Sequence, residues 1–215
     1  MYISRVEIDR YNRRKVRDLT HVGAYHAWVE ESFPSELEQS IRTRKLWRID
    51  RIQGKDYLII VSKEKPNLQK LEKYGVVGSA QTKDYQHFLD SIKTGFRMNF
   101  RIVLNPVISI TSPDKSKRGV VKPHVTIKHQ MDFLVKQSEK NGFSLVGESF
   151  SIVERGYEVF QKPEKPIRLS KVVYEGTLTV SDDTLFKKML TEGVGKKKAY
   201  GFGLMTGYHL RNESW

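Results

Sequence analysis

The sequence predicts an α+β protein made of two ferredoxin-like (RRM-like) domains in tandem. Segments in which polar and apolar residues alternate are interleaved with segments in which apolar residues recur at helical spacing. Their order is strand, helix, strand, strand, helix, strand, as in the ferredoxin-like fold, and it occurs twice along the 215 residues. We therefore expect a first domain at residues 1–94 and a second domain at residues 95–215.

The first repeat begins with alternating residues that predict a strand at residues 2–9. Apolar residues at helical spacing then predict a helix over residues 19–32, which Pro34 should end. Ser35 followed by Glu38 has the form of a capping box for a short second helix. The rest of this half is expected to contain strands at residues 46–52 and 57–62, a turn at 54–56, a helix at 67–74 and a weak strand after Gly78.

The second repeat begins with a long strand-like segment at residues 96–110. Pro106 within it should make a bulge or place the strand at a sheet edge. The remaining elements are expected, in chain order, as a polar loop at 113–123, a helix at 124–141, strands at 143–153 and 157–161, a turn at Pro163 and Pro166, a strand at 172–180, a helix capped by Ser181 and Asp182 that runs to Leu190, and a strand at 203–210.

The chain is strongly basic. Its 38 Lys and Arg residues outnumber the 25 Asp and Glu residues, which gives a net charge of +13 at pH 7. An excess of this size favours a polyanionic partner such as nucleic acid. Aromatic residues make up 11% of the chain and hydrophobic residues 38%, which is too much for a disordered basic tail.

The sequence contains no cysteine, which excludes structural disulfides, zinc ribbons, iron–sulfur clusters and thiol catalysis. Residues 1–15 alternate polar and apolar residues instead of forming the apolar region of a signal peptide, and no stretch approaches the length of about 18 apolar residues that a membrane span needs. We therefore expect a cytoplasmic protein without a membrane partner. Binding to an anionic membrane surface is a minor alternative.

Residues 193–204 form a glycine-rich segment with three consecutive lysines. The segment does not fit the P-loop, which ends in Gly-Lys-Ser/Thr, nor the dinucleotide motif, because it follows a predicted helix and lacks the third glycine at the right offset. Its backbone N–H groups and lysines suit a flexible loop that binds phosphates. A helix end and tight turn with solvated lysines is the alternative. The candidate RNA-binding residues here are Gly195, Lys196, Lys197, Lys198 and Gly201.

His21 and His26 lie on or beside the first predicted helix. Their spacing of five residues does not fit the i, i+4 histidine pair that binds zinc on a helix. A neutral imidazole can instead accept a proton from a ribose 2′-hydroxyl or, once protonated, donate one to a leaving 5′-oxygen. RNA carries its own nucleophile, so such a strand break needs neither a metal ion nor a cofactor. A structural or surface role is the alternative for each histidine.

The carboxylates do not suggest a metal centre. Asp182 and Asp183 lie where a helix cap is needed, and Glu30 and Glu31 lie near a helix end. A two-metal nuclease site would have to be assembled from scattered acids. We therefore assign no metal ligand, and a metal-dependent nuclease is the less favoured enzyme.

Five segments are spread over the whole chain. Each is a weak signal alone, but the five together, in this order, are specific for one family. They are MYISRV at residues 1–6, HAWVEESFP at 26–34, FRIVLNP at 100–106, YEGTLTV at 174–180 and the glycine-rich segment at 193–204. In this order they resemble the CasE family, the CRISPR repeat-processing endoribonucleases of type I-E systems. The resemblance implies tandem ferredoxin-like domains and metal-independent cleavage of CRISPR precursor RNA at the base of the repeat stem-loop. It also implies 5′-hydroxyl and 2′,3′-cyclic phosphate ends, and an enzyme that stays on the guide RNA as a subunit of the Cascade complex.

The resemblance also implies a catalytic residue. In the family the catalytic histidine lies at a fixed distance before the Phe-Pro that ends the first helix, and this position corresponds to His26. Some members have a tyrosine three residues before that histidine, where this chain has Gly23. The second catalytic group is therefore open: Tyr25 or His21 can replace the tyrosine, or none is needed.

Basic residues outside the glycine-rich segment are candidates for binding the RNA stem. Because double-stranded RNA is recognised mostly by its shape and phosphates, they should set affinity and register. A solvated surface charge is the alternative for each of them, and a non-catalytic RNA-binding subunit of a CRISPR ribonucleoprotein is the alternative for the whole protein. The candidates are Arg13, Arg14, Lys115, Lys117, Arg118, Lys122, Lys128, Arg155 and Arg168.

Overall fold

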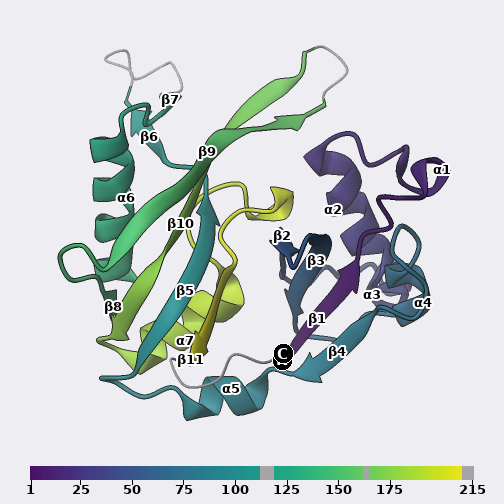
Figure 1. The fold of residues 1–215 in the computed structure, drawn as a ribbon, viewed down its shortest axis with the longest axis horizontal. Helices are drawn as coiled ribbons and strands as arrows, with labels where there is room; N and C mark the ends of the chain where they lie inside the picture. The colour runs from purple at the N-terminus through teal and green to yellow at the C-terminus, as the bar shows by residue number, and fades with distance from the viewer. Residues whose placement is uncertain (112–118, 162–164, 210–215) are drawn as a thin grey trace.

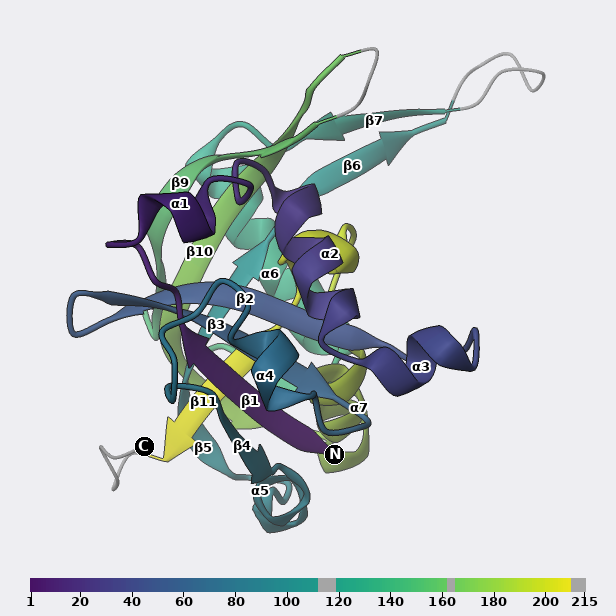
Figure 2. The ribbon, with the colours of Figure 1, turned by 90° about the vertical axis from the view of Figure 1, so that its right-hand side faces the viewer.

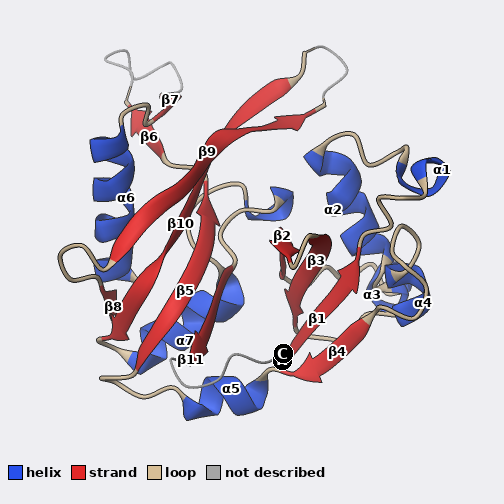
Figure 3. Cartoon of the chain, in the orientation of Figure 1, coloured by secondary structure: helices blue, strands red, loops and turns tan. Residues whose placement is uncertain are grey.

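The computed structural model describes residues 1–111, 119–161 and 165–209. Within these residues the chain forms two antiparallel sheets that lie side by side and a separate two-stranded ribbon (Figure 1). Both halves contain helices and strands, as the colours of Figure 3 show, so the predicted α+β class is confirmed.

The first sheet has the strand order β2-β3-β1-β4, and all neighbouring strands are antiparallel. Its last strand returns to lie beside its first, as a β-α-β-β-α-β unit of the ferredoxin type requires. The elements of this repeat are β1 (Tyr2–Glu7), α2 (Val22–Glu31), β2 (Lys45–Ile52), β3 (Lys55–Ser62), α4 (Leu68–Leu71) and β4 (Gln81–Asp84).

Short helices lie outside this repeat at α1 (Arg13–Val16), α3 (Pro34–Glu38) and α5 (Gln86–Ser91). The sequence pattern does not predict α1 or α5. It predicts α3, but the expected capping box is wrong. Phe33 is the N-cap and Ser35 lies inside the helix, where its hydroxyl donates to Glu64 Oε2 at 3.3 Å. Proline suits the first helical position because its φ is fixed and its missing N–H has no partner there in any case.

The second sheet repeats the order of the first, with β11-β5-β10 followed by β9, and the short β8 also pairs with β10. Asp182 caps α7 as predicted, because its side chain accepts the Leu185 N–H at 2.9 Å. The predicted tandem ferredoxin-like fold is therefore confirmed. The elements are β5 (Arg97–Leu104), α6 (Ile127–Lys140), β8 (Phe143–Ser144), β9 (Phe150–Phe160), β10 (Ile167–Val180), α7 (Asp183–Glu192), the 3-10 turn η1 (Lys198–Tyr200) and β11 (Met205–His209).

The single strand predicted at residues 96–110 is wrong. β5 ends at Leu104, and β6 (Val107–Ile110) pairs with β7 (Val120–Pro123) in the separate ribbon. Pro106 lies between them, and because proline offers no N–H to a ladder, the chain leaves the sheet there. β7 also occupies the end of the predicted polar loop.

The strand predictions between residues 143 and 161 are also partly wrong. The structure has the short β8 followed by a continuous β9, in which Gly156 pairs with Lys171 instead of interrupting the strand. Pro163, half of the predicted turn, lies outside the described residues.

The two halves share their hydrophobic cores. Successive residues of β3 alternate between the two faces of the first sheet: Leu58 and Ile60 pack in the core under α2, and Ile59 and Val61 in the core that continues into the second sheet. Val103 of β5 joins the core under α2. Each core thus contains residues from both sides of residue 94, and the domain boundary predicted there stays a prediction.

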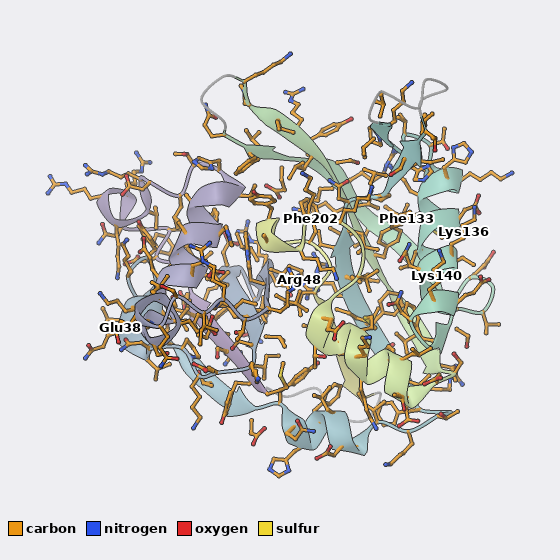
Figure 4. All side chains as sticks on the ribbon, turned by 180° about the vertical axis from the view of Figure 1, so that it is seen from behind. Glu38, Arg48, Phe133, Lys136, Lys140 and Phe202 are labelled. Carbon is orange, nitrogen blue, oxygen red and sulfur yellow. The ribbon has the colours of Figure 1, made fainter. Side chains whose placement is uncertain are left out.

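A buried arginine joins the two sheets. Arg48 on β2 is 2% exposed, and its guanidinium pairs with Asp50 on the same strand. It also donates to the Arg101 carbonyl at 2.8 Å, the Leu204 carbonyl at 2.9 Å and the Thr206 hydroxyl at 2.6 Å, all in the second half. Figure 4 shows Arg48 at this junction, near the loop that carries Phe202. The end of the glycine-rich segment is thereby fixed against the first sheet.

Candidate active site

The helix α2, which carries His26, begins at a histidine. His21 is the N-cap residue, and its Nδ1 accepts the Gly23 N–H at 3.1 Å. A Cβ at position 23 would lie 2.9 Å from the His21 ring and 3.0 Å from Phe160, which is closer than real Cβ contacts allow without a shift. Packing therefore accounts for glycine at position 23. The hydrogen bond from the Gly23 N–H gives His21 a structural role at the start of the helix.

His26 lies against the glycine-rich segment. Its ring meets the ring of Tyr200 edge to face, with 5.8 Å between the ring centroids, and its side chain is 31% exposed. Tyr200 closes η1 and also packs against Phe160, with 4.4 Å between centroids. Figures 1 and 2 both show η1 beside α2. The structure thus brings together a histidine and a loop segment that the sequence singles out separately.

Three charged side chains, Glu30, Arg42 and Lys45, act on the His26 ring. Glu30 Oε1 lies 3.9 Å from His26 Nδ1. The pKa of His26 is below its ordinary value, first because the ring is partly buried and then because Arg42 and Lys45 are nearby, while Glu30 opposes this effect. At neutral pH the imidazole is therefore mainly neutral, as a proton acceptor must be. The sequence pattern assigns no role to Arg42 or Lys45.

The glycine-rich segment, which its composition predicts to be a flexible loop, has backbone hydrogen bonds and close contacts with both sheets. Trp47 Nε1 donates to the Ala199 carbonyl at 3.1 Å. Gly201 has φ +83°, and a Cβ there would lie 2.9 Å from the Trp47 ring. Gly203 donates its N–H to the Val103 carbonyl at 2.8 Å. Backbone contacts with both sheets therefore fix the course of the segment.

The three consecutive lysines have different neighbours. Lys196 Nζ donates to the Ser109 hydroxyl at 2.7 Å, and Lys197, in the left-handed conformation at φ +67°, places Nζ 6.0 Å from the centre of the Tyr200 ring. Lys198 Nζ donates to the Glu192 carbonyl at 2.9 Å. Burial lowers the pKa of Lys198, and the nearby Arg44 lowers it further. Lys197, through its contact with Tyr200, adjoins the His26 site.

Tyr25 and His21 line a cleft of about 450 Å³ that lies between the two halves, and His26 is not part of its lining. Tyr25 is 7% exposed and stacks on Trp47, with 6.0 Å between centroids. Burial raises the pKa of Tyr25, while Arg10 opposes the shift. Both alternatives for the second catalytic group thus face this cleft, whereas His26 faces Tyr200 and Glu30.

The other basic candidates lie mainly on surfaces. Arg13 and Arg14 are exposed on α1, and Lys122 and Lys128 are exposed on β7 and α6. Lys115, Lys117 and Arg118 lie outside the described residues. The β6–β7 ribbon and the long β9–β10 hairpin project from the same side of the second half, at the top of Figures 1 and 2.

Two arginines of the β9–β10 hairpin have contacts within the protein. Arg155 Nη2 donates to the Val125 carbonyl at 2.6 Å, and the Arg168 guanidinium lies 5.9 Å from the centre of the Tyr157 ring. Both residues are exposed. Their remaining donors can therefore reach a phosphate from this surface.

Neither a metal centre nor a membrane span is visible in the part of the chain that the structure describes. No three His, Asp or Glu side chains there gather closely enough to hold a metal ion. No helix there has the length and apolar character needed to cross a bilayer.

Comparison with known proteins identifies the family. A CRISPR-associated endoribonuclease, Cse3 of Thermus thermophilus, is 26% identical over 218 residues, which cover 96% of this chain and 99% of Cse3. The structure of a Cse3 bound to a 19-nucleotide RNA is similar with a TM-score of 0.79 at 24% identity, covering 97% of this chain and 100% of that one. A chain of a CRISPR RNA-guided surveillance complex is 18% identical with a TM-score of 0.65, covering 98% and 100%. A family model described as CRISPR associated protein matches residues 1–206, so the resemblance inferred from the sequence is confirmed and the chain belongs to this family.

Proposed function

We propose that this protein is an endoribonuclease that cleaves CRISPR precursor RNA at the base of the repeat stem-loop without a metal ion. The observation that carries the proposal is the contact between His26 and Tyr200, which puts a mainly neutral, partly exposed imidazole beside a cationic glycine-rich segment. The likeness to Cse3, an endoribonuclease that has been solved with bound RNA, supports it. The product remains on the enzyme as guide RNA within a Cascade complex, and the proposed location of this activity is the cytoplasm.

The proposed reaction is an attack by the RNA on itself. His26 accepts the proton of the 2′-hydroxyl at the cut site, and the resulting oxygen attacks the adjacent phosphorus. The bond from phosphorus to the 5′-oxygen breaks, so one product ends in a 2′,3′-cyclic phosphate. The other product ends in a 5′-hydroxyl, once that oxygen takes a proton from the imidazolium formed in the first step or from water. A positioned base of this kind contributes roughly 10²- to 10⁴-fold to the rate.

The glycine-rich segment stabilises the charge that builds on the phosphate. Lys197 and His26 both contact Tyr200: Lys197 Nζ lies 6.0 Å and the centre of the His26 ring 5.8 Å from the centre of the Tyr200 ring. Cationic side chains that are already held in position stabilise a transition state without reorganising during the reaction. The basic surfaces on α1, the β6–β7 ribbon and the β9–β10 hairpin bind the RNA stem through contacts with its phosphates.

The experiment is to incubate the protein with its cognate repeat RNA in EDTA. We expect one cut, which a 2′-deoxy substitution at the cut site abolishes. His26→Ala should retain the RNA gel shift and lose the cut. The rate should fall as pH drops through the His26 pKa, because protonation removes the acceptor.

Other outcomes of this experiment separate the alternatives. A gel shift with intact RNA would assign the protein to the non-catalytic RNA-binding subunits. Cleavage that EDTA abolishes would indicate a metal-dependent nuclease. Normal cleavage by His26→Ala would remove His26 from the reaction.

A further inference from the structure

Glu30, which lies close to His26 on α2, is also paired with the buried Lys45. Glu30 lies one turn after His26 on α2, with Oε1 at 3.9 Å from His26 Nδ1. The other oxygen of the same carboxylate, Oε2, accepts from Lys45 Nζ at 3.3 Å. The two oxygens of Glu30 thus face two different partners, and the carboxylate bridges His26 to β2.

Lys45 itself is held rigidly. Its side chain is 1% exposed, and Nζ donates to Glu36 Oε2 at 2.6 Å and lies 4.9 Å from the centre of the Phe33 ring. A buried ammonium is costly unless it is paired, so the carboxylates around it have to stay in place. Glu36 is itself bonded to the backbone N–H and the hydroxyl of Thr43. Lys45 is therefore a fixed anchor rather than a mobile surface charge.

We propose that Glu30 is a positioning residue for His26, and that the buried pair of Lys45 and Glu36 fixes the carboxylate of Glu30 where it faces Nδ1. This inference rests on the proposed function, since it assigns His26 the reacting role. A carboxylate beside one ring nitrogen favours the tautomer protonated on that nitrogen, which leaves Nε2 as the proton acceptor. Glu30 does not need to touch the RNA to act in this way.

The groups around His26 determine whether each substitution raises or lowers its pKa. Glu30 on the same helix raises the pKa of His26, while Lys45 on β2 and Arg42 before that strand lower it, and burial of the ring has the largest effect. Tyr200 of η1 packs on the ring, and Lys197 lies next to Tyr200. Removing the Glu30 charge should therefore lower the pKa of His26, and removing the Lys45 charge should raise it.

The test combines an NMR titration of the His26 imidazole in the free protein with single-turnover cleavage of repeat RNA. The His26 signal is the one that His26→Ala removes. In Glu30→Gln we expect the His26 pKa to fall by about half a pH unit, the size typical of a partly exposed charge pair. The cleavage rate should fall about tenfold, because positioning is lost, while the RNA dissociation constant stays the same.

Glu31→Gln is the matched control. Glu31 is the neighbouring carboxylate on α2, and it pairs with Lys73 at 2.7 Å instead of with the His26 site. This variant should change neither the His26 pKa nor the rate. Lys45→Met combined with Glu36→Gln removes both charges of the buried pair together, so that Glu36 is not left as an unpaired buried carboxylate, while the partly exposed Glu30 loses its lysine partner. It should raise the His26 pKa.

The two readouts separate this inference from the proposed function. If Glu30→Gln matches the wild type in both pKa and rate, the positioning role is wrong even if His26 is essential for cleavage. If the wild type cleaves no repeat RNA but the titration shows the expected shifts in opposite directions, the proposed function fails and the coupling of Glu30, Lys45 and His26 stands.

Discussion

Replacing Arg48 with methionine tests whether the junction between the sheets depends on one buried guanidinium. Methionine fills similar volume but offers no donor, so the carbonyls of Arg101 and Leu204 lose their bonds to residue 48. Asp50, whose side chain is 9% exposed, has two arginine partners in the wild type. In the variant it loses Arg48 and retains its 3.2 Å contact with Arg101 Nε. Removing one partner of a buried ion pair costs about 3–5 kcal/mol. Because Arg101 still compensates Asp50 in part, we expect a loss of about 3 kcal/mol in the free energy of unfolding.

Urea denaturation followed by tryptophan fluorescence measures this loss. With a denaturant slope of about 3 kcal/mol per molar urea, the midpoint should fall by about 1 M. Arg13→Met on the exposed helix α1 is the control and should change stability by less than about 0.5 kcal/mol. An Arg48→Met protein within about 1 kcal/mol of the wild type would refute the proposed role of the guanidinium, since that is the size of a single ordinary hydrogen bond.

Three further predictions concern the glycine-rich segment and the binding surface. Gly203→Ala should destabilise the protein by about 2 kcal/mol or more, because φ is +87° and the new Cβ would lie 2.4 Å from the Val194 carbonyl oxygen. Gly78→Ala, also at positive φ but with open space around it, should cost clearly less, and equal losses would show that the clash is absent. Trp47→Phe removes the bond to Ala199 and should slow cleavage about fivefold at unchanged RNA affinity. Trp28→Phe loses a similar bond, to the Leu71 carbonyl instead of to the glycine-rich segment, and should leave the rate unchanged. RNA affinity should fall steeply between about 50 and 200 mM salt, and Arg14→Ala should reduce the slope of that dependence by about one. A flat salt response would show that phosphate contacts do not dominate binding.

The repeated fold was predictable because its signals are local. The continuous apolar run within residues 57–62 is typical of a strand that is buried on both faces, and Asp182 before a periodic segment indicates a helix start. The short helices α1 and α5 could not be predicted in the same way, because four to six residues hold too little periodicity. Pro106 correctly predicted an irregularity in the strand at residues 96–110, but only the structure shows that the chain leaves the sheet there.

The site was predictable only in part. The glycine-rich segment was singled out by its residue types, whereas the choice of His26 over His21 came from the family resemblance. Their contact through Tyr200 depends on how the two sheets pack, which no local pattern encodes. Lys45 reads as an ordinary residue at the start of a strand, because its burial requires Glu30 and Glu36 from two other elements. Long-range pairing of this kind is the part of a site that a single sequence does not specify.

The proposed reaction requires His26 and the glycine-rich segment to meet the same phosphate. A structure of the protein with repeat RNA that carries a 2′-deoxy residue at the cut site tests this most directly. We expect C2′ of the cut-site residue to lie close enough to the His26 imidazole that a 2′-oxygen on it would reach hydrogen-bonding distance. We also expect a non-bridging phosphate oxygen to be bound by a lysine or N–H group of residues 193–204. A cut-site phosphate too far from His26 for even one water molecule to bridge would contradict the proposed reaction.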